Sequence, residues 1–287
     1  MDVKSYSDPA DFLAETQEAL ESNEVANSLM LGICSRLVRT PIHDADPPCL
    51  KTVRGKSGLV LAAIMTPPHK MVVCGHQGDL HGGATLLVKD VLAQGWRVPG
   101  VFGQRDIARI VTKTWSEATG AEHVLEERLR VYELREVQLP IPERGRLRQA
   151  TEVDMDLVSE WSSTFQVAIL QKQDEATVRH LTETRISEGT VYLWEAPEPV
   201  SMAMKTRPTR HGISVALVYT PPELRRRGFG TACVGELSRL LLKDGHSFCS
   251  LFANLENDTA IAMYHRIGYR PVCNYDQFAF RGSGEAS

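Results

Sequence analysis

A glycine turn between a long apolar segment and an amphipathic one constrains the fold of this chain more than any other feature. Residues 212–220, GISVALVYT, are apolar and rich in β-branched side chains, which predicts a buried strand. Residues 221–230, PPELRRRGFG, follow it directly. The apolar positions after the turn recur on one helical face: Cys233, Val234, Leu237, Leu240 and Leu241. A helix that begins at such a turn presents unpaired N–H groups and a partial positive charge, which predicts an anion site.

The spacing of the glycines indicates which kind of anion site this is. The sequence contains no Walker motif, GxxxxGK[ST], and a dinucleotide fingerprint would need a glycine where Cys233 stands. The pattern [R/Q]-x-x-G-x-[G/A] fits, with Arg225, Gly228 and Gly230. Alone, three consecutive arginines would predict a solvated surface loop. Their position between a strand and a helix favours a phosphate-binding loop instead.

The composition excludes several classes of partner. The chain has 287 residues, of which 43% are hydrophobic and 24% charged, and a formal net charge of −4. An acidic chain without a basic, aromatic-interleaved face has no general attraction to nucleic acid or anionic membranes. The N-terminus shows no signal-peptide pattern, and no apolar stretch is long enough to span a bilayer. The six cysteines form no CxxC pair and no zinc spacing, which predicts free buried thiols in a cytoplasmic protein without a metal.

The chain divides near residues 140–150, a segment rich in proline, glycine and arginine. We therefore predict one domain over residues 1–140 and a second over 145–287. Both show helices, strands, helix, strand, helix and strand in that order. Both also contain Thr-Pro-Pro after an apolar segment, at residues 66–68 and 220–222, which are 154 residues apart. These observations predict an internal duplication.

A second motif lies in residues 257–271, NDTAIAMYHRIGYRP, where the pattern NxxAxxxYxxxGY begins at Asn257. Together with residues 218–232, VYTPPELRRRGFGTA, this segment resembles the GCN5-related N-acetyltransferases. The motifs cover residues 213–275, and the order of elements extends the resemblance over the rest of the chain. It implies an α/β fold in tandem, in which each half is a central mixed β-sheet flanked by helices.

The resemblance also implies roles for particular residues. Backbone N–H groups of Val218, Tyr219 and Thr220 would bind the pantetheine and the thioester carbonyl of acetyl-CoA. Tyr264 would protonate the departing thiolate, and Asn257 would contact the pantetheine. The loop that would hold the pyrophosphate contains Arg225, Arg226, Arg227, Gly228, Phe229, Gly230 and Thr231.

The activity implied is transfer of acetyl from acetyl-CoA to a primary amine by direct attack in a ternary complex. The alternative is an acyl-CoA-binding or regulatory protein that does not catalyse. Tyr264 also has the spacing of a core tyrosine, and Asn257 the position of a plain N-cap. The sequence does not choose a general base among Glu175, Glu183, Glu195, His211 and water, and it leaves the acceptor and the oligomeric state open.

The first half lacks the cofactor motifs at the offset of 154. Tyr264 then corresponds to Ile110 and Asn257 to Gly103, and no RxxGxG follows residues 66–68. We therefore expect this half not to catalyse. Residues 75–83, GHQGDLHGG, could form a metal site through His76, Asp79 and His81, but a polar, glycine-rich loop is the favoured interpretation.

Overall fold

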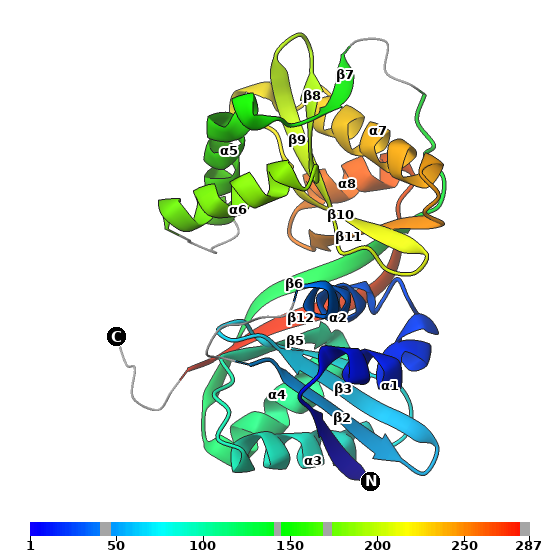
Figure 1. Ribbon diagram of the computed structural model, residues 1–287, viewed down its shortest axis with the longest axis vertical. Coiled ribbons are helices and arrows are strands. Elements are labelled where there is room, and N and C mark those ends of the chain that lie inside the picture. Colours follow the sequence, from blue (N-terminus) through cyan, green and yellow to red (C-terminus); the bar gives the residue numbers. More distant parts are fainter. Residues whose placement is uncertain (41–46, 141–144, 169–173, 282–287) are drawn as a thin grey trace. The chain divides into compact units, whose positions relative to one another are not determined.

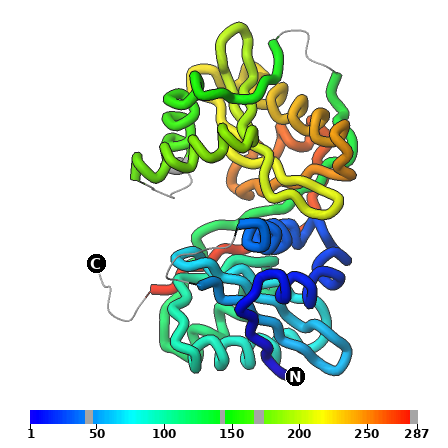
Figure 2. Tube along the Cα trace, in the orientation of Figure 1, coloured from blue at the N-terminus to red at the C-terminus, as the bar shows by residue number. Residues whose placement is uncertain are grey.

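The computed structural model describes residues 1–40, 47–140, 145–168 and 174–281. They form two compact units, each traced in Figures 1 and 2. The first unit comprises Met1–Tyr132, Phe252–Asn257 and Pro271–Ser287, and the second comprises Glu133–Leu251 and Asp258–Arg270. Each unit contains a mixed sheet with helices packed on it, which confirms the predicted fold class.

The first unit has the strand order β1-β2-β3-β4-β5-β12-β6. Strands β1 to β4 pair antiparallel, β4 and β5 pair parallel, and β12 pairs antiparallel with β5. The strands are β1 (Asp2–Tyr6), β2 (Cys49–Gly55), β3 (Gly58–Met65), β4 (Met71–Gly75), β5 (Gly100–Gln104), β6 (Glu122–Leu134) and β12 (Arg270–Arg281). The helices are α1 (Pro9–Glu21), α2 (Ser28–Arg39), α3 (Leu80–Ala93) and α4 (Arg105–Thr119).

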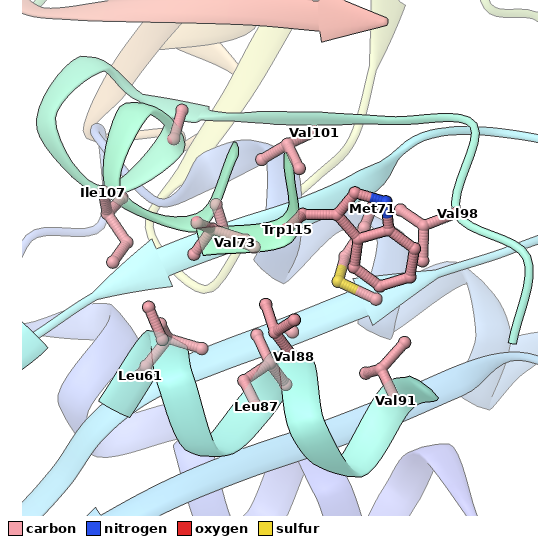
Figure 3. Close-up of a cluster of buried hydrophobic side chains, with 14 of the residues drawn as sticks. Leu61, Met71, Val73, Leu87, Val88, Val91, Val98, Val101, Ile107 and Trp115 are labelled. Carbon is pink, nitrogen blue, oxygen red and sulfur yellow. The ribbon is translucent and has the colours of Figure 1, made fainter. Parts of the chain in front are cut away.

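Helices cover both faces of this sheet, which explains why β3 is apolar along its whole length. Successive side chains of a strand point to opposite faces. Leu61 therefore packs with the α3 and α4 side chains shown in Figure 3, among them Leu87, Val88 and Trp115. Ile64 faces the other way and joins the cluster of α1 and α2.

The second unit contains the glycine turn. Its strand order, starting from the end of β6, is β6-β11-β10-β9-β8-β7. The strands are β7 (Arg146–Gln149), β8 (Val191–Glu195), β9 (Pro199–Thr206), β10 (Gly212–Tyr219) and β11 (Phe248–Asn254). The helices are α5 (Met155–Ala168), α6 (Glu175–Ser187), α7 (Phe229–Lys243) and α8 (Asp258–Ile267), with 3-10 turns at Glu152–Asp154 and Pro222–Leu224. Helices α5 and α6 pack through Trp161 and Ile186 against β8, β9 and β10.

The order strand, two helices, three strands, helix, strand, helix, strand occurs twice along the chain, first from β1 to β6 and then from β7 to β12. In this order β4 corresponds to β10 and α3 to α7. The two Thr-Pro-Pro strings do not correspond, because residues 66–68 connect β3 to β4 whereas residues 220–222 follow β10. The offset of 154 was therefore a wrong alignment at this point, although the duplication itself is visible in the fold.

The compact units also differ from the predicted division of the chain. That division assigned residues 145–287 to one domain, but β12 pairs with β5 in the first unit, from Tyr275–Gln104 to Ala279–Gly100. The division into domains 1–140 and 145–287 stays a prediction about the repeats. The second repeat, as the order of elements defines it, ends in β12, and all but the first residue of that strand belongs to the first compact unit.

Candidate active site

Strand β10 ends in a bulge. It pairs with β9 at Ala216–Met204 and again at Tyr219–Met202, so β10 has one residue more than β9 between these pairs. The backbone at Leu217 has φ +51°, a conformation that a leucine rarely adopts. A bulge redirects the backbone groups that follow it, and bulges concentrate beside active sites. The predicted thioester-binding residues lie in and just after this bulge.

Strand β10 also parts from its other neighbour before it ends. In the described parts of both strands, the parallel pairing runs from Gly212–Phe248 to Ser214–Ser250. Strand β10 continues to Tyr219 beyond that last pair. The part of β10 after Ser214 is therefore not paired with the described part of β11.

The loop after β10 leads into α7 through two left-handed residues. Arg226 has φ +61° and Gly228, the N-cap of α7, has φ +84°. A glycine adopts this backbone without strain, and a Cβ at Gly228 would meet no atom within 4 Å. Within the described structure no side chain caps the helix here. The first N–H groups of α7 therefore remain available to an anion.

Gly230 is small for a different reason. A Cβ there would lie 3.1 Å from Thr220 Oγ1 and 3.4 Å from Met263 Sδ. The missing side chain lets the end of β10 and helix α8 both approach the first turn of α7. Gly230 is therefore required for the packing of these elements. The sequence predicted only its other role, in the approach of a ligand.

The three arginines are exposed and surround the start of α7. Arg225 Nε donates to the carbonyl of Thr220 at 3.0 Å, and its guanidinium lies 6.0 Å from the Tyr219 ring centre. The Arg227 guanidinium lies 4.9 Å above the ring of Phe229. These contacts fix two positive charges beside the uncapped helix end, which strengthens its attraction for a polyanion.

Tyr264 is buried in α8, at 6% exposure, and its ring packs edge-on against Tyr269 at 5.8 Å. Burial raises the pKa of the Tyr264 phenol well above its usual value, so the group keeps its proton at any physiological pH. Met263, the residue before Tyr264 in α8, lies close to Gly230 in the first turn of α7. This part of α8 therefore lies beside the phosphate loop. Asn257 is exposed and directly precedes α8.

The counterpart of the phosphate loop in the first unit is the segment that precedes α3. Asp79 caps this helix, and its Oδ1 accepts the N–H of Gly82 at 2.9 Å. The equivalent position before α7 is Gly228, which has no side chain. A carboxylate of the chain itself therefore occupies the anion position in the first unit. In the described part of the chain, no three His, Cys, Asp or Glu residues are placed to hold a metal ion.

The candidate general bases differ in their surroundings. Glu195 pairs with Arg148 and, at 2.7 Å, with Arg146. These arginines lower the pKa of the Glu195 carboxyl, so it is a weak acceptor for an ammonium proton. Glu183 is exposed on α6, and the structure gives it no special environment.

Two further residues bear on the chemistry of the unit. Cys233 is fully buried in α7, and burial raises the pKa of its thiol to about 12, which fits a packing role rather than a nucleophile. Ser201 of β9, which sequence reasoning missed, is also fully buried and donates to the carbonyl of Tyr219. The available signal was a lone hydroxyl within the apolar stretch of residues 200–204, VSMAM.

Comparisons with known proteins agree with this geometry. A family model described as FR47-like protein matches residues 199–277, which include the bulged strand, the loop and Tyr264. A comparison with curated proteins gives no match. None of the described helices is long and apolar enough to cross a membrane.

Solved structures resemble the chain over nearly its whole length. A GNAT-family acetyltransferase from Colwellia psychrerythraea aligns at TM-score 0.63 and 11% identity, covering 98% of this chain and 100% of that one. A GCN5-related N-acetyltransferase from Sphaerobacter thermophilus aligns at 0.61 and 13%, covering 97% and 95%. A tandem GNAT protein from the clavulanic acid biosynthesis pathway aligns at 0.60 and 12%, covering 99% of both chains. At 11–13% identity these alignments show the fold, and the family match over residues 199–277 agrees with the resemblance that the motifs indicated.

Proposed function

We propose that this chain, a protein of the GCN5-related N-acetyltransferase superfamily with the tandem fold, transfers acetyl from acetyl-CoA to a primary amine in its second repeat. One observation carries the proposal. The bulged end of β10 leads within a few residues to an uncapped helix N-terminus that is surrounded by arginines. The strand end would bind the thioester of an acyl-CoA through backbone N–H groups. The helix N-terminus beside it would bind the pyrophosphate.

The phosphate loop would bind the nucleotide half of the co-substrate. The N–H groups of residues 226–231 would donate to the pyrophosphate, and the α7 dipole and the arginines favour its negative charge. Gly228 leaves room for this contact, because the space that a Cβ would occupy there is open.

The end of β10 would bind the reacting half. Backbone N–H groups of Val218, Tyr219 and Thr220 would orient the pantetheine and stabilise the oxyanion that forms on the thioester carbonyl. The amine nitrogen forms a bond to this carbonyl carbon, the C–S bond breaks, and the sulfur leaves with the electron pair. The ammonium loses its proton to water or a base, and the thiolate takes one from the phenol of Tyr264.

A proton donor to the thiolate must be protonated when the thiolate forms. Tyr264 meets this condition, because burial raises the pKa of its phenol. The same burial disfavours the tyrosinate, so its proton must return quickly from solvent or from the ammonium. The alternative function, binding an acyl-CoA without turnover, needs the loop and the bulge but not this proton. A Tyr264→Phe variant therefore separates the two functions.

We further propose that the first repeat does not catalyse, because Asp79 occupies its anion position. The buried cysteines are unpaired, which suits a reducing compartment such as the cytoplasm.

Calorimetric titration with acetyl-CoA tests the proposal, using wild type and the pair Gly228→Asp and Gly228→Asn. Aspartate and asparagine have the same shape and both tolerate a left-handed backbone, so the pair differs only in charge. We expect wild type to bind, and Gly228→Asp to bind at least about tenfold more weakly than Gly228→Asn through repulsion of the phosphates. A wild type without affinity for acetyl-CoA refutes the function. Binding without turnover across a panel of amines supports the alternative.

A further inference from the structure

The bulged end of β10 is fastened to β9 by one buried hydroxyl. Ser201 Oγ donates to the carbonyl of Tyr219 at 2.9 Å and lies 2.9 Å from Thr220 Oγ1. Ser201 is fully buried, and so are its neighbours Met202 and Ala203. No water can therefore replace this hydroxyl without a rearrangement of the strand.

The direction of these hydrogen bonds follows from the proton count. The Ser201 hydroxyl has one proton and gives it to the Tyr219 carbonyl. The hydroxyl of Thr220 must then donate to Ser201. Arg225 Nε donates to the carbonyl of Thr220 at 3.0 Å. Thr220 is thus fixed through its side chain on one side and through its backbone on the other.

This fastening holds a strained segment. Leu217 has φ +51°, a left-handed conformation that is unfavourable for a residue with a side chain. Strained backbone persists only where its surroundings determine it from several sides. Beyond the Ser214–Ser250 pair the described part of β11 no longer pairs with β10, so β9 and the side chains packed on Leu217 and Tyr219 restrain the strand end. Ser201 connects β9 to both residues after the bulge.

We infer that Ser201 is a positioning residue for the acyl thioester, which orients the N–H groups of Val218, Tyr219 and Thr220 without touching the ligand. The inference rests on the proposed function of this strand end. The hydrogen bonds described above connect Ser201 to the phosphate loop only through Thr220, whereas they connect it to the strand end directly. Ser201 should therefore affect the affinity for the thioester half of the co-substrate more than the affinity for the nucleotide half.

The test compares two ligands on matched variants. The ligands are acetyl-CoA and adenosine 3′-phosphate 5′-diphosphate, which keeps the phosphates but lacks the pantetheine. Ser201→Ala is matched by Ser214→Ala on the paired part of β10. Ser214 is also buried and shares a hydrogen bond with Ser250 Oγ at 2.9 Å, so each variant removes one buried, hydrogen-bonded hydroxyl. Thermal melting shows whether both remain folded.

We expect Ser201→Ala to weaken acetyl-CoA on the order of tenfold, as for a misdirected donor at a reacting carbonyl. Its affinity for the nucleotide should stay within about twofold of wild type, and Ser214→Ala should bind both ligands like wild type. The inference is overturned if Ser201→Ala binds acetyl-CoA normally or loses both ligands equally.

If Ser201→Ala does not fold, Ser201→Cys keeps a weak donor of similar size and is measured in the same way, with an intermediate loss of acetyl-CoA affinity expected. A cysteine variant with wild-type affinity for both ligands would refute the role of the hydroxyl. Failure of wild type to bind either ligand would refute the proposed function instead, so the two failures are distinct.

Discussion

Arg109 in α4 donates from Nε to Oδ2 of Asp276 in β12 at 2.8 Å, and this carboxylate is fully buried. Arg105 donates to the other oxygen, Oδ1, at 3.1 Å. Strand β12, the last of the described strands, is thereby tied to the first turns of a helix that lies 167 to 171 residues earlier in the sequence. The first unit consequently depends on a strand from the C-terminal end of the chain.

Asp276→Asn should destabilise the first unit. The amide is uncharged and its NH₂ group faces an arginine donor, so at least one charge-assisted hydrogen bond is lost at a buried site. Bonds of this kind contribute about 1.5–3 kcal/mol, and we expect the free energy of unfolding to fall by that amount. Urea denaturation measures it. The control is Glu117→Gln, which breaks the exposed pair with Lys113 and should change stability by less than about 0.5 kcal/mol. Equal effects of the two variants would contradict the importance of the buried pair.

Gly100→Ala should disrupt the pairing of β5 with β12. A Cβ at Gly100 would lie 2.0 Å from the carbonyl oxygen of Phe278, a backbone atom that cannot rotate away. Overpacking of this kind costs roughly 1–3 kcal/mol or more. Gly95→Ala is the control, since its Cβ would meet nothing within 4 Å and only the positive φ of +73° is unfavourable. Chemical denaturation should show the larger loss for Gly100→Ala, and the reverse order would show that the two strands are not held this closely.

The second unit shows how much of a fold a local pattern predicts. Residues 212–220 are predicted as a buried strand, and Gly212–Tyr219 forms β10; the predicted helix after the glycine turn is α7, Phe229–Lys243. Continuous apolar character and a helical period are local signals, and Gly245, with φ +103°, follows the end of α7. These features require no knowledge of what packs against them.

Other elements gave no local signal. Strand β2 was missed because Lys51 interrupts its apolar character. The side chain is buried and paired with Asp90 at 2.6 Å, a partner that lies far away in the sequence. Strand β7 was missed because Arg146–Gln149 is a short, polar edge strand. The partner of β12 was also beyond sequence reasoning, since strand pairing is decided by tertiary contacts.

The site divides in the same way. The arginines and glycines of residues 225–230 predicted the phosphate loop. The bulge at Leu217 could not be predicted in this way, because no glycine marks its left-handed backbone. The hydroxyl of Ser201 and the capping carboxylate of Asp79 matter through the groups they face, and only the fold identifies those groups.

Tyr264→Phe should lower kcat without changing the pH dependence of the rate. Burial raises the pKa of the Tyr264 phenol, so the wild-type residue is protonated below about pH 10 and does not titrate within the working range. Loss of a general acid costs on the order of 10²-fold in rate. Steady-state rates from pH 6 to about pH 10, with an amine that the panel identifies, measure both quantities. Loss of an alkaline limb in the variant would contradict the raised pKa.

Tyr269→Phe is the matched control for this measurement. Tyr269 is buried beside Tyr264 and shares a hydrogen bond with Ser238 at 2.9 Å, so Tyr269→Phe removes a buried tyrosine hydroxyl that has no proposed role in proton transfer. We expect it to reduce stability by about 1 kcal/mol and to leave kcat within a few-fold of wild type. A similar loss of kcat in both variants would identify Tyr264 as a core residue without a proton to give.

Acetyl-CoA should bind this chain with a stoichiometry of one, because Asp79 supplies the first repeat with an anion of its own. The carboxylate accepts the N–H of Gly82 at 2.9 Å, at the helix end that corresponds to the start of α7. Asp79→Ala removes an N-cap and should cost about 1 kcal/mol of stability. It should not create a second acyl-CoA site, since no arginine series like residues 225–227 precedes α3. Titration calorimetry gives the stoichiometry for wild type and variant. Two sites in wild type would mean that the carboxylate yields to phosphate, and the first repeat would then have to be treated as a second acyl-CoA domain.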